Sequence, residues 1–352
     1  MNQPPSSRPA VLLIGHGTRL AAGVAEFRNL AEQLQQALPD RSCLAGFLEL
    51  VEPSVPEALE TLWQQGFRRV TALPALLMAA GHVKNDIPTI IKDFQAEHPG
   101  LTITFGADLG IHANLLQIAR ERIESVEKAF GPSYDRRGTL LLVIGRGSSD
   151  PDANSNISKI TRMLWEGMGF GWAETAYTAV AAPLMADALK RTHRLGFQRL
   201  IVLPYLLFTG RLVEEVRATI AAHQAIHPEV RIALAPYLNT HPLLIETFLE
   251  RLHDAEQGEV RMSCQLCPYR SPIVGREDWQ GAPQITHHHD HHDHHDHHDH
   301  HDHHHPNDHH QTHHHHDHHH HHSHGHDHHH HPHGHHHHSH GHDQNDQSDH
   351  GH

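Results

Sequence analysis

The 352-residue chain has few cysteines and no long apolar run. Its cysteines are Cys43, Cys264 and Cys267, and such a low, odd number argues against a disulfide framework and for a reducing compartment. No window holds the roughly 18 consecutive apolar residues of a membrane span. Residues Met1 to Pro9 also lack an apolar signal core. We therefore expect a cytoplasmic protein without a membrane partner.

Positive charge is absent from the C-terminal tail. His287 to His352 contains 40 of the 49 histidines and 11 aspartates, with no lysine, arginine or aliphatic residue. Without these aspartates the formal net charge changes from -14 to -3, so the rest of the chain offers no basic face for nucleic acid. A tail of this composition cannot bury enough apolar surface to offset its chain entropy. We expect it to be disordered and to bind metal ions.

The main organising feature is an internal repeat. The motif LLIGHGTR begins at Leu12 and returns as LVIGRGSS at Leu142, 130 positions later. The motif HPGLTI near His98 returns as HPEVRI near His227, 129 positions later. The repeat predicts two homologous domains, and the composition predicts two further segments: domains at 10–130 and 138–256, a cysteine-containing linker at 257–286 and the tail at 287–352.

Each half alternates apolar runs with helical patterns. The predicted strands of the first half are Val11–Ile14, Cys43–Leu48, Val70–Leu73 and Leu101–Phe105. The predicted helices are Leu20–Leu38, Ser54–Gln65, Val83–Glu97 and Ala113–Ala129. Strands that are apolar throughout and separated by helices are typical of a parallel sheet covered on both faces. We predict a duplicated, doubly wound α/β fold, in which ligands bind at the carboxyl ends of the strands.

Three polar residues follow predicted strands of the first half. His16 lies within GHG, Glu49 within FLELVEP and His82 within AAGHVKND. All three are therefore expected at one edge of the sheet. Two imidazoles and a carboxylate suit a borderline divalent metal ion, and an imidazole also accepts protons near neutral pH.

The second half differs at the matching positions. His16 corresponds to Arg146, Glu49 to Ala179 and His82 to Arg211. One repeat thus has metal-ligand types where the other has cations. Guanidinium groups are natural partners for carboxylates, so we predict one site with metal chemistry from the first half and anion binding from the second.

Simpler interpretations remain open for these residues. His16 could be a solvated loop residue, and Glu49 could cap the helix that begins near Ser54. The GHG turn could bind phosphate, but neither a Walker lysine nor a GxGxxG pattern supports a nucleotide site. Four other histidines are expected to be structural: His98, His112, His227 and His241.

The linker carries a single CxxC motif. Cys264 and Cys267 in MSCQLC supply only two thiolates, whereas zinc and iron–sulfur sites usually have four ligands. A second chain could complete a cluster across a dimer interface, or the pair could serve redox chemistry or metal delivery. Cys43 falls inside a predicted strand and is expected to be a small buried side chain.

Several of these motifs together resemble one family. LLIGHGTR, FLELVEPS, ALPALLMAAGHVKNDIP and IGRGSSDPDAN are similar to CbiX-type sirohydrochlorin chelatases, a branch of the class II chelatases. The similarity extends from about Ala10 to Leu252. The duplication, the MxCxxC segment and the histidine-rich tail resemble the long form of the cobaltochelatase.

The resemblance implies a function. It implies insertion of Co²⁺ into sirohydrochlorin for cobalamin biosynthesis without ATP, with His16 and His82 binding the metal and accepting protons, helped by Glu49. The substrate is a polycarboxylate, and its expected partners between the two domains are Arg19, Lys84, Arg146 and Arg211. Some long forms carry a 4Fe–4S centre at the MxCxxC segment, which here would involve Cys264 and Cys267.

Three alternatives stay open. The chain could insert Fe²⁺ to make siroheme, or insert Ni²⁺, because the affinity order of metals alone does not select the ion. It could also be a non-enzymatic cobalt or nickel storage and delivery protein with the tail as its working part. Either a monomer or a homodimer agrees with the duplication, because short members of the family are single domains that dimerise.

Overall fold

The computed structural model describes residues 9–260, 262 and 264–284. The first repeat forms a four-stranded parallel sheet in the order β2-β1-β3-β4. Its strands are β1 (Ala10–Gly15), β2 (Ser42–Phe47), β3 (Arg69–Pro74) and β4 (Thr102–Phe105). Every residue of the central strand β1 is buried, which explains why its sequence is apolar throughout.

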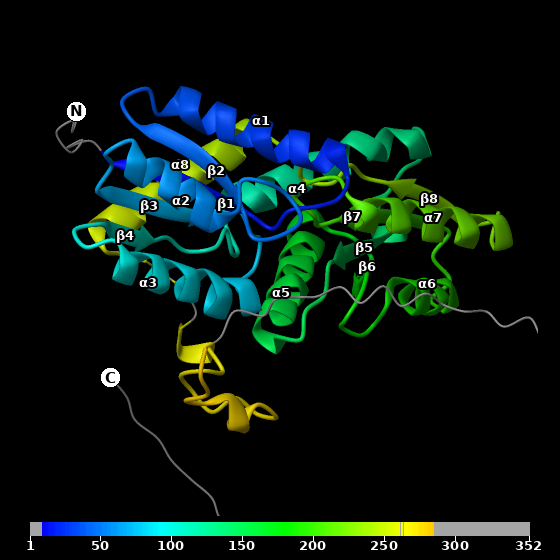
Figure 1. Cartoon of the computed structure of the whole chain (residues 1–352). Coiled ribbons are helices and arrows are strands. Elements are labelled where there is room, and N and C mark those ends of the chain that lie inside the picture. Colours follow the sequence, from blue (N-terminus) through cyan, green and yellow to red (C-terminus); the bar gives the residue numbers. More distant parts are fainter. Residues whose placement is uncertain (1–8, 261, 263, 285–352) are drawn as a thin grey trace, which may run out of the picture. The chain divides into compact units, whose positions relative to one another are not determined.

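The second repeat forms an equivalent sheet in the order β6-β5-β7-β8. Its strands are β5 (Leu140–Gly145), β6 (Trp172–Tyr177), β7 (Arg199–Pro204) and β8 (Arg231–Leu234). The two sheets share strand order and direction, so the predicted duplicated α/β fold is confirmed (Figure 1). The predicted tail from residue 287 onward lies outside the described residues.

Helices follow most strands, as the apolar periodicity predicts. Those of the first repeat are α1 (Ala21–Ala37), α2 (Val55–Gln64), α3 (Ile87–Glu97) and α4 (Ala113–Glu127). Those of the second are α5 (Pro151–Met168), α6 (Met185–Arg194), α7 (Arg211–Ile226) and α8 (Pro242–Gln257). Short helical turns complete the elements: η1 (His82–Asp86), η2 (Lys128–Phe130), η3 (Arg136–Gly138), η4 (Cys264–Leu266) and η5 (Glu277–Trp279). Within the described part of the chain, no helix is long and apolar enough to cross a membrane.

The last helix of each repeat is exchanged between the sheets. α4 follows β4 but packs against β7 and β8, whereas α8 follows β8 but packs against β3 and β4. Figure 1 shows α8, in yellow, beside the strands of the first sheet. Leu244 and Phe248 of α8 and Leu115 of α4 belong to one apolar core that continues through both repeats, and burying each such side chain contributes about 1.5–3 kcal/mol. The repeat boundary in the sequence therefore does not separate two independently packed domains.

Two histidines hold the exchanged helices together. His112 and His241 are the N-caps of α4 and α8, and each Nδ1 accepts a hydrogen bond from a backbone N–H of its own helix. Their Nε2 atoms reach across to the other helix, His112 to Glu250 at 2.9 Å and His241 to Glu121 at 3.1 Å. The predicted structural role of these two histidines is confirmed.

A π-turn precedes α3. In η1 the N–H of Ile87 donates to the carbonyl oxygen of His82, five residues back. An α-helical bond would span four residues, so the π-turn accommodates one extra residue. Such turns are rare and often mark functional sites. The second repeat has a regular α-helix here, α7.

The extra residue corrects one sequence match. The N–H of Lys84 donates to the carbonyl oxygen of Ala80, and the N–H of Glu214 donates to that of Gly210. This hydrogen-bond pattern pairs Ala80 with Gly210, and hence His82 with Leu212 and not with Arg211. Beyond the π-turn, the buried Ile87 matches the buried Val216. The two repeats therefore shift register inside η1, which is the segment that carries His82.

Candidate active site

His16 is placed by a tight turn after β1. Gly17 adopts a φ of +98°, and a Cβ on it would lie 1.9 Å from the carbonyl oxygen of Glu49, so only glycine fits here. The backbone of Glu49 approaches closely because its N–H donates to the carbonyl oxygen of His16 at 3.0 Å. The turn thus joins the loops after β1 and β2.

The two predicted metal-binding histidines face each other. The Nε2 atoms of His16 and His82 lie 3.2 Å apart, and their rings meet edge to face at 4.7 Å between centroids. Two imidazole nitrogens bound to one ion at about 2.1 Å would lie about 3.0–3.4 Å apart. The observed separation therefore matches that of two ligands of a single metal ion.

A carboxylate stands behind each histidine. The Nδ1 of His16 lies 3.1 Å from Glu49 Oε1, and the Nδ1 of His82 lies 2.6 Å from Asp86 Oδ2. A carboxylate at Nδ1 holds the proton there and leaves the Nε2 lone pair for a metal. In this structure Glu49 contacts the Nδ1 of His16, whereas the sequence suggested that it binds metal or accepts protons.

Arg146 brings positive charge from the second repeat. It follows β5 as His16 follows β1, and it is exposed. Surrounding protein lowers the pKa of its guanidinium, and the nearby carboxylate of Glu49 opposes that shift. Arginine remains charged at neutral pH, so the second repeat contributes a cation beside the first repeat's histidine pair.

Arg19 and Arg211 are both exposed. Arg19 lies just before α1, and Arg211 is the first residue of α7. Glu26 of α1 accepts a hydrogen bond from the N–H of Thr209 at 2.7 Å, which fixes the loop before Arg211 against α1. Both guanidinium groups, one from each repeat, are therefore accessible to solvent.

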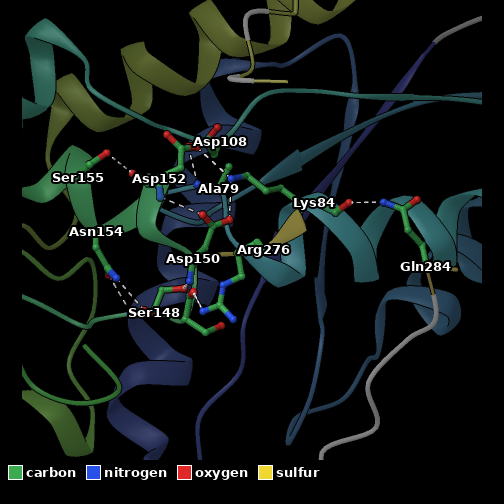
Figure 2. Close-up of polar contacts among 11 residues, drawn as sticks. Ala79, Lys84, Asp108, Ser148, Asp150, Asp152, Asn154, Ser155, Arg276 and Gln284 are labelled. Carbon is green, nitrogen blue, oxygen red and sulfur yellow. Dashed lines mark hydrogen bonds and ion pairs between the residues drawn. The ribbon is translucent and has the colours of Figure 1, made fainter. Parts of the chain in front are cut away.

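Lys84 is placed differently from the arginines. Its side chain is 5% exposed, and its Nζ donates to Asp150 at 2.6 Å and to Asp152 at 3.0 Å (Figure 2). Burial disfavours the ammonium, but hydrogen bonds to the two carboxylates outweigh this and raise the pKa of Lys84. A buried cation already paired with two carboxylates is unsuited to substrate, so we assign Lys84 to the contact between the repeats.

The CbiX family model matches residues 10–126 and 140–255. The chain belongs to the CbiX family. It is 36% identical over 272 residues to a sirohydrochlorin cobaltochelatase of Priestia megaterium, covering 76% of this chain and 87% of that protein. It is 31% identical over 234 residues to a sirohydrochlorin ferrochelatase of the same organism, covering 66% and 85%.

A solved structure agrees with this assignment. SirB from Bacillus subtilis with Fe³⁺ matches with a TM-score of 0.63 at 27% identity, covering 72% of this chain and 98% of that one. The two Priestia megaterium relatives share a tetrapyrrole in their names and differ in the metal. The relatives of this chain therefore include both a cobalt chelatase and an iron chelatase.

The CxxC segment of this CbiX chain lies beside the π-turn. Gln284 donates to the carbonyl oxygen of Lys84 at 2.7 Å (Figure 2), and a cavity of about 720 Å³ is lined by Val83, Cys264 and Cys267 among others. Across the described ranges, no third histidine, cysteine or carboxylate joins these two thiols at metal-ligand distance. The iron–sulfur hypothesis thus gains no support from this chain's own residues. The third thiol, Cys43 in β2, is half-buried rather than fully buried as expected, and its partial burial raises its pKa to about 12.

Sequence reasoning missed Asp86 and the partners of Lys84. A signal for Asp86 existed, because HVKND places a carboxylate four residues after His82, a spacing that lets side chains meet on one helical face. For Asp150 and Asp152 the only signal was the DPD motif within IGRGSSDPDAN. Their role depends on how the repeats pack, which no local pattern reveals.

Proposed function

We propose that this chain inserts a divalent metal ion, cobalt as first choice, into sirohydrochlorin without a nucleotide. The observation that carries the proposal is the pair of facing Nε2 atoms of His16 and His82 at 3.2 Å. Each opposite ring nitrogen is held by a carboxylate. An imidazole pair prepared in this way can hold a metal ion and later take up protons.

The chemistry requires an exchange of protons for metal. Free sirohydrochlorin carries two pyrrolic N–H groups, and the inserted M²⁺ replaces both protons. As the ion moves to the ring nitrogens, the Nε2 lone pairs of His16 and His82 become free. Each can accept one proton, because an imidazole titrates near neutral pH. Glu49 and Asp86 stabilise the imidazolium ions that result.

Arginines account for binding of the macrocycle's carboxylates. Arg146 lies near Glu49, and Arg19 and Arg211 are exposed at the start of α1 and α7. Guanidinium groups bind carboxylates through paired hydrogen bonds. We expect Arg146→Ala to raise the KM for sirohydrochlorin more than it lowers kcat, since Arg146 does not hold the metal.

One relative is named for cobalt and another for iron. The cobaltochelatase of Priestia megaterium is 36% identical and the ferrochelatase 31% identical, and the histidine pair suits either ion. Cobalt is our first choice because of the higher identity, together with the resemblance of the duplicated chain to long cobaltochelatases.

The test compares three metals with the purified full chain under anaerobic conditions. Sirohydrochlorin is mixed with Co²⁺, Fe²⁺ or Ni²⁺ at matched free concentrations, and the absorbance change of the macrocycle gives the enzyme-dependent rate. We expect insertion without ATP and the highest kcat/KM with Co²⁺. A higher value with Fe²⁺ or Ni²⁺ would overturn the metal assignment, and no enzyme-dependent insertion of any ion would overturn the proposal.

A further inference from the structure

Three histidines gather on the second repeat, on elements separate from the His16 and His82 pair. His193 lies in α6, His223 in the last turn of α7, and His227 directly after α7. The ring centroids of His193 and His227 are 4.0 Å apart, and those of His223 and His227 are 4.6 Å apart. Glu229 lies two residues further along the chain and joins the same group.

The first repeat shows what these positions do when they only pack. There Trp63 corresponds to His193, Phe94 to His223, and His98 to His227. His98 stacks on Phe94 at 4.0 Å and meets Trp63 edge to face at 5.1 Å. Its Nδ1 bonds the carbonyl oxygen of Phe94, and its Nε2 faces Glu60 at 3.1 Å. Both nitrogens are therefore engaged by the protein.

The second repeat replaces packing residues with metal-ligand types. Two of the aromatic rings become imidazoles. The position of Gly100, which has no neighbour within 4 Å of an added Cβ, becomes Glu229. Packing alone does not require this combination, because tryptophan and phenylalanine fill the same space in the first repeat. Two or three imidazoles with a carboxylate are instead a common ligand set for borderline divalent ions.

The ligand atoms converge. His227 Nδ1 is 3.2 Å from Glu229 Oε1, and His193 Nδ1 is 3.8 Å from the same oxygen. One ligand atom from each of the three residues lies within 4.8 Å of the other two. Ligands of one ion at bond lengths of about 2.0–2.2 Å are about 3.0–3.6 Å apart, so side-chain shifts of a few tenths of an ångström to about one ångström would close the set.

Two further observations favour a ligand. The Nδ1 of His193 is buried and has no hydrogen-bond partner among the described residues, which is costly unless something else occupies it. The turn that carries His227 and Glu229 is also fixed, because Gln224 Nε2 donates to the carbonyl oxygens of His227 at 3.1 Å and Val230 at 2.6 Å. A fixed turn keeps the two ligands at their spacing.

We propose that His193, His227 and Glu229 form a second binding site for a borderline divalent metal ion, with His223 next to His227. The ring centroid of His223 lies 4.6 Å from that of His227 and 6.4 Å from that of His193, so His223 stands beside the three ligand residues. Glu229 is 57% exposed, so the ion can enter from and leave to solvent. The site would hold a metal ion apart from the reaction centre, and it does not depend on the proposed catalytic function.

The test measures the chemical labelling of each histidine separately, because the histidine-rich tail would dominate any measurement of total bound metal. The full chain is treated with diethylpyrocarbonate at neutral pH, with and without Co²⁺ held at a fixed free concentration by a metal buffer. Peptide mass spectrometry then measures labelling at His193, His227 and His241. At ten times the dissociation constant about nine in ten sites are filled, so labelling of His193 and His227 should fall about tenfold while His241 stays unchanged.

Three variants make the test specific. Glu229→Gln removes the anionic ligand and should abolish or weaken the protection, whereas Glu214→Gln makes the same change elsewhere in the second repeat and should not. The triple variant His193→Trp, His223→Phe, Glu229→Gly restores the first repeat's residues, and it should fold and show no protection at His227. Co²⁺-independent labelling of His193 and His227 in the wild-type chain, or protection that survives in the triple variant, would overturn the proposal.

Discussion

Replacing Asp86 by asparagine isolates the orienting role of the carboxylates. The Oδ2 of Asp86 lies 2.6 Å from His82 Nδ1, and its Oδ1 accepts a hydrogen bond from Asn85 Nδ2 at 2.7 Å. In Asp86→Asn the Asn85 donor keeps the amide oxygen on its own side, so the new NH₂ group faces His82. That NH₂ must donate to Nδ1, which moves the imidazole proton to Nε2.

The size of the expected fall in insertion rate follows from the loss of His82 as a metal ligand. A protonated Nε2 cannot bind a metal ion, so His82 must adopt the unfavourable tautomer before it can ligate. Loss of such an outer partner costs about 10–100-fold in metal affinity or activity, or about 1.4–2.7 kcal/mol. We expect the rate of Co²⁺ insertion at subsaturating metal to fall by this factor, and we expect the free energy of unfolding to change much less.

The assay is the initial rate of Co²⁺ insertion into sirohydrochlorin over a range of free Co²⁺, with urea unfolding as the check on folding. Asp93→Asn, an exposed position on α3, is the matched control and should behave as wild type. An Asp86→Asn chain that is folded and inserts Co²⁺ as fast as the control would refute the argument that the carboxylate sets the tautomer of His82.

Three other predictions concern stability and the tail. Lys84→Met should lower the free energy of unfolding in urea by about 3–5 kcal/mol, because it leaves Asp150 and Asp152 buried without their cation; an unchanged midpoint would show that the ion pair is dispensable. Burial raises the pKa of Asp108 to about 6, so the folded state favours the protonated carboxyl. The free energy of unfolding of the wild-type chain therefore falls as pH rises through 6. The stability of Asp108→Asn relative to wild type should therefore grow by up to about 3 kcal/mol between pH 4 and 7, and a difference independent of pH would contradict the assignment. A chain ending at Thr286 should keep its insertion rate at saturating Co²⁺ but bind many fewer ions in equilibrium dialysis, and equal stoichiometry would rule out storage by the tail.

Much of the fold is predictable because its signals are local. Apolar runs such as Val11–Ile14 become buried strands, and the predicted helix Ser54–Gln65 forms as α2 with Ser54 as its N-cap. The repeat offset then gives the second sheet from the first. The exchange of α4 and α8 was not predictable, since each helix has the same apolar face whichever sheet it covers.

The candidate site was predictable where strand ends determine it. His16, Glu49 and His82 converge because the carboxyl ends of parallel strands meet at one edge. The π-turn escaped prediction because a one-residue difference between repeats can be placed in a loop or in a helix with equal ease. The burial of Lys84 escaped for another reason: its partners Asp150 and Asp152 come from the other repeat.

The most direct test of the account removes both facing imidazoles at once. The double variant His16→Ala, His82→Ala is compared with His112→Asn, His241→Asn, which removes two histidines but keeps side chains able to cap α4 and α8. Insertion of Co²⁺ into sirohydrochlorin is measured on both, with circular dichroism confirming the fold. We predict no enzyme-dependent insertion in the first variant and wild-type kcat in the second. Wild-type insertion by a folded His16→Ala, His82→Ala chain would contradict the claim that these two imidazoles carry the metal.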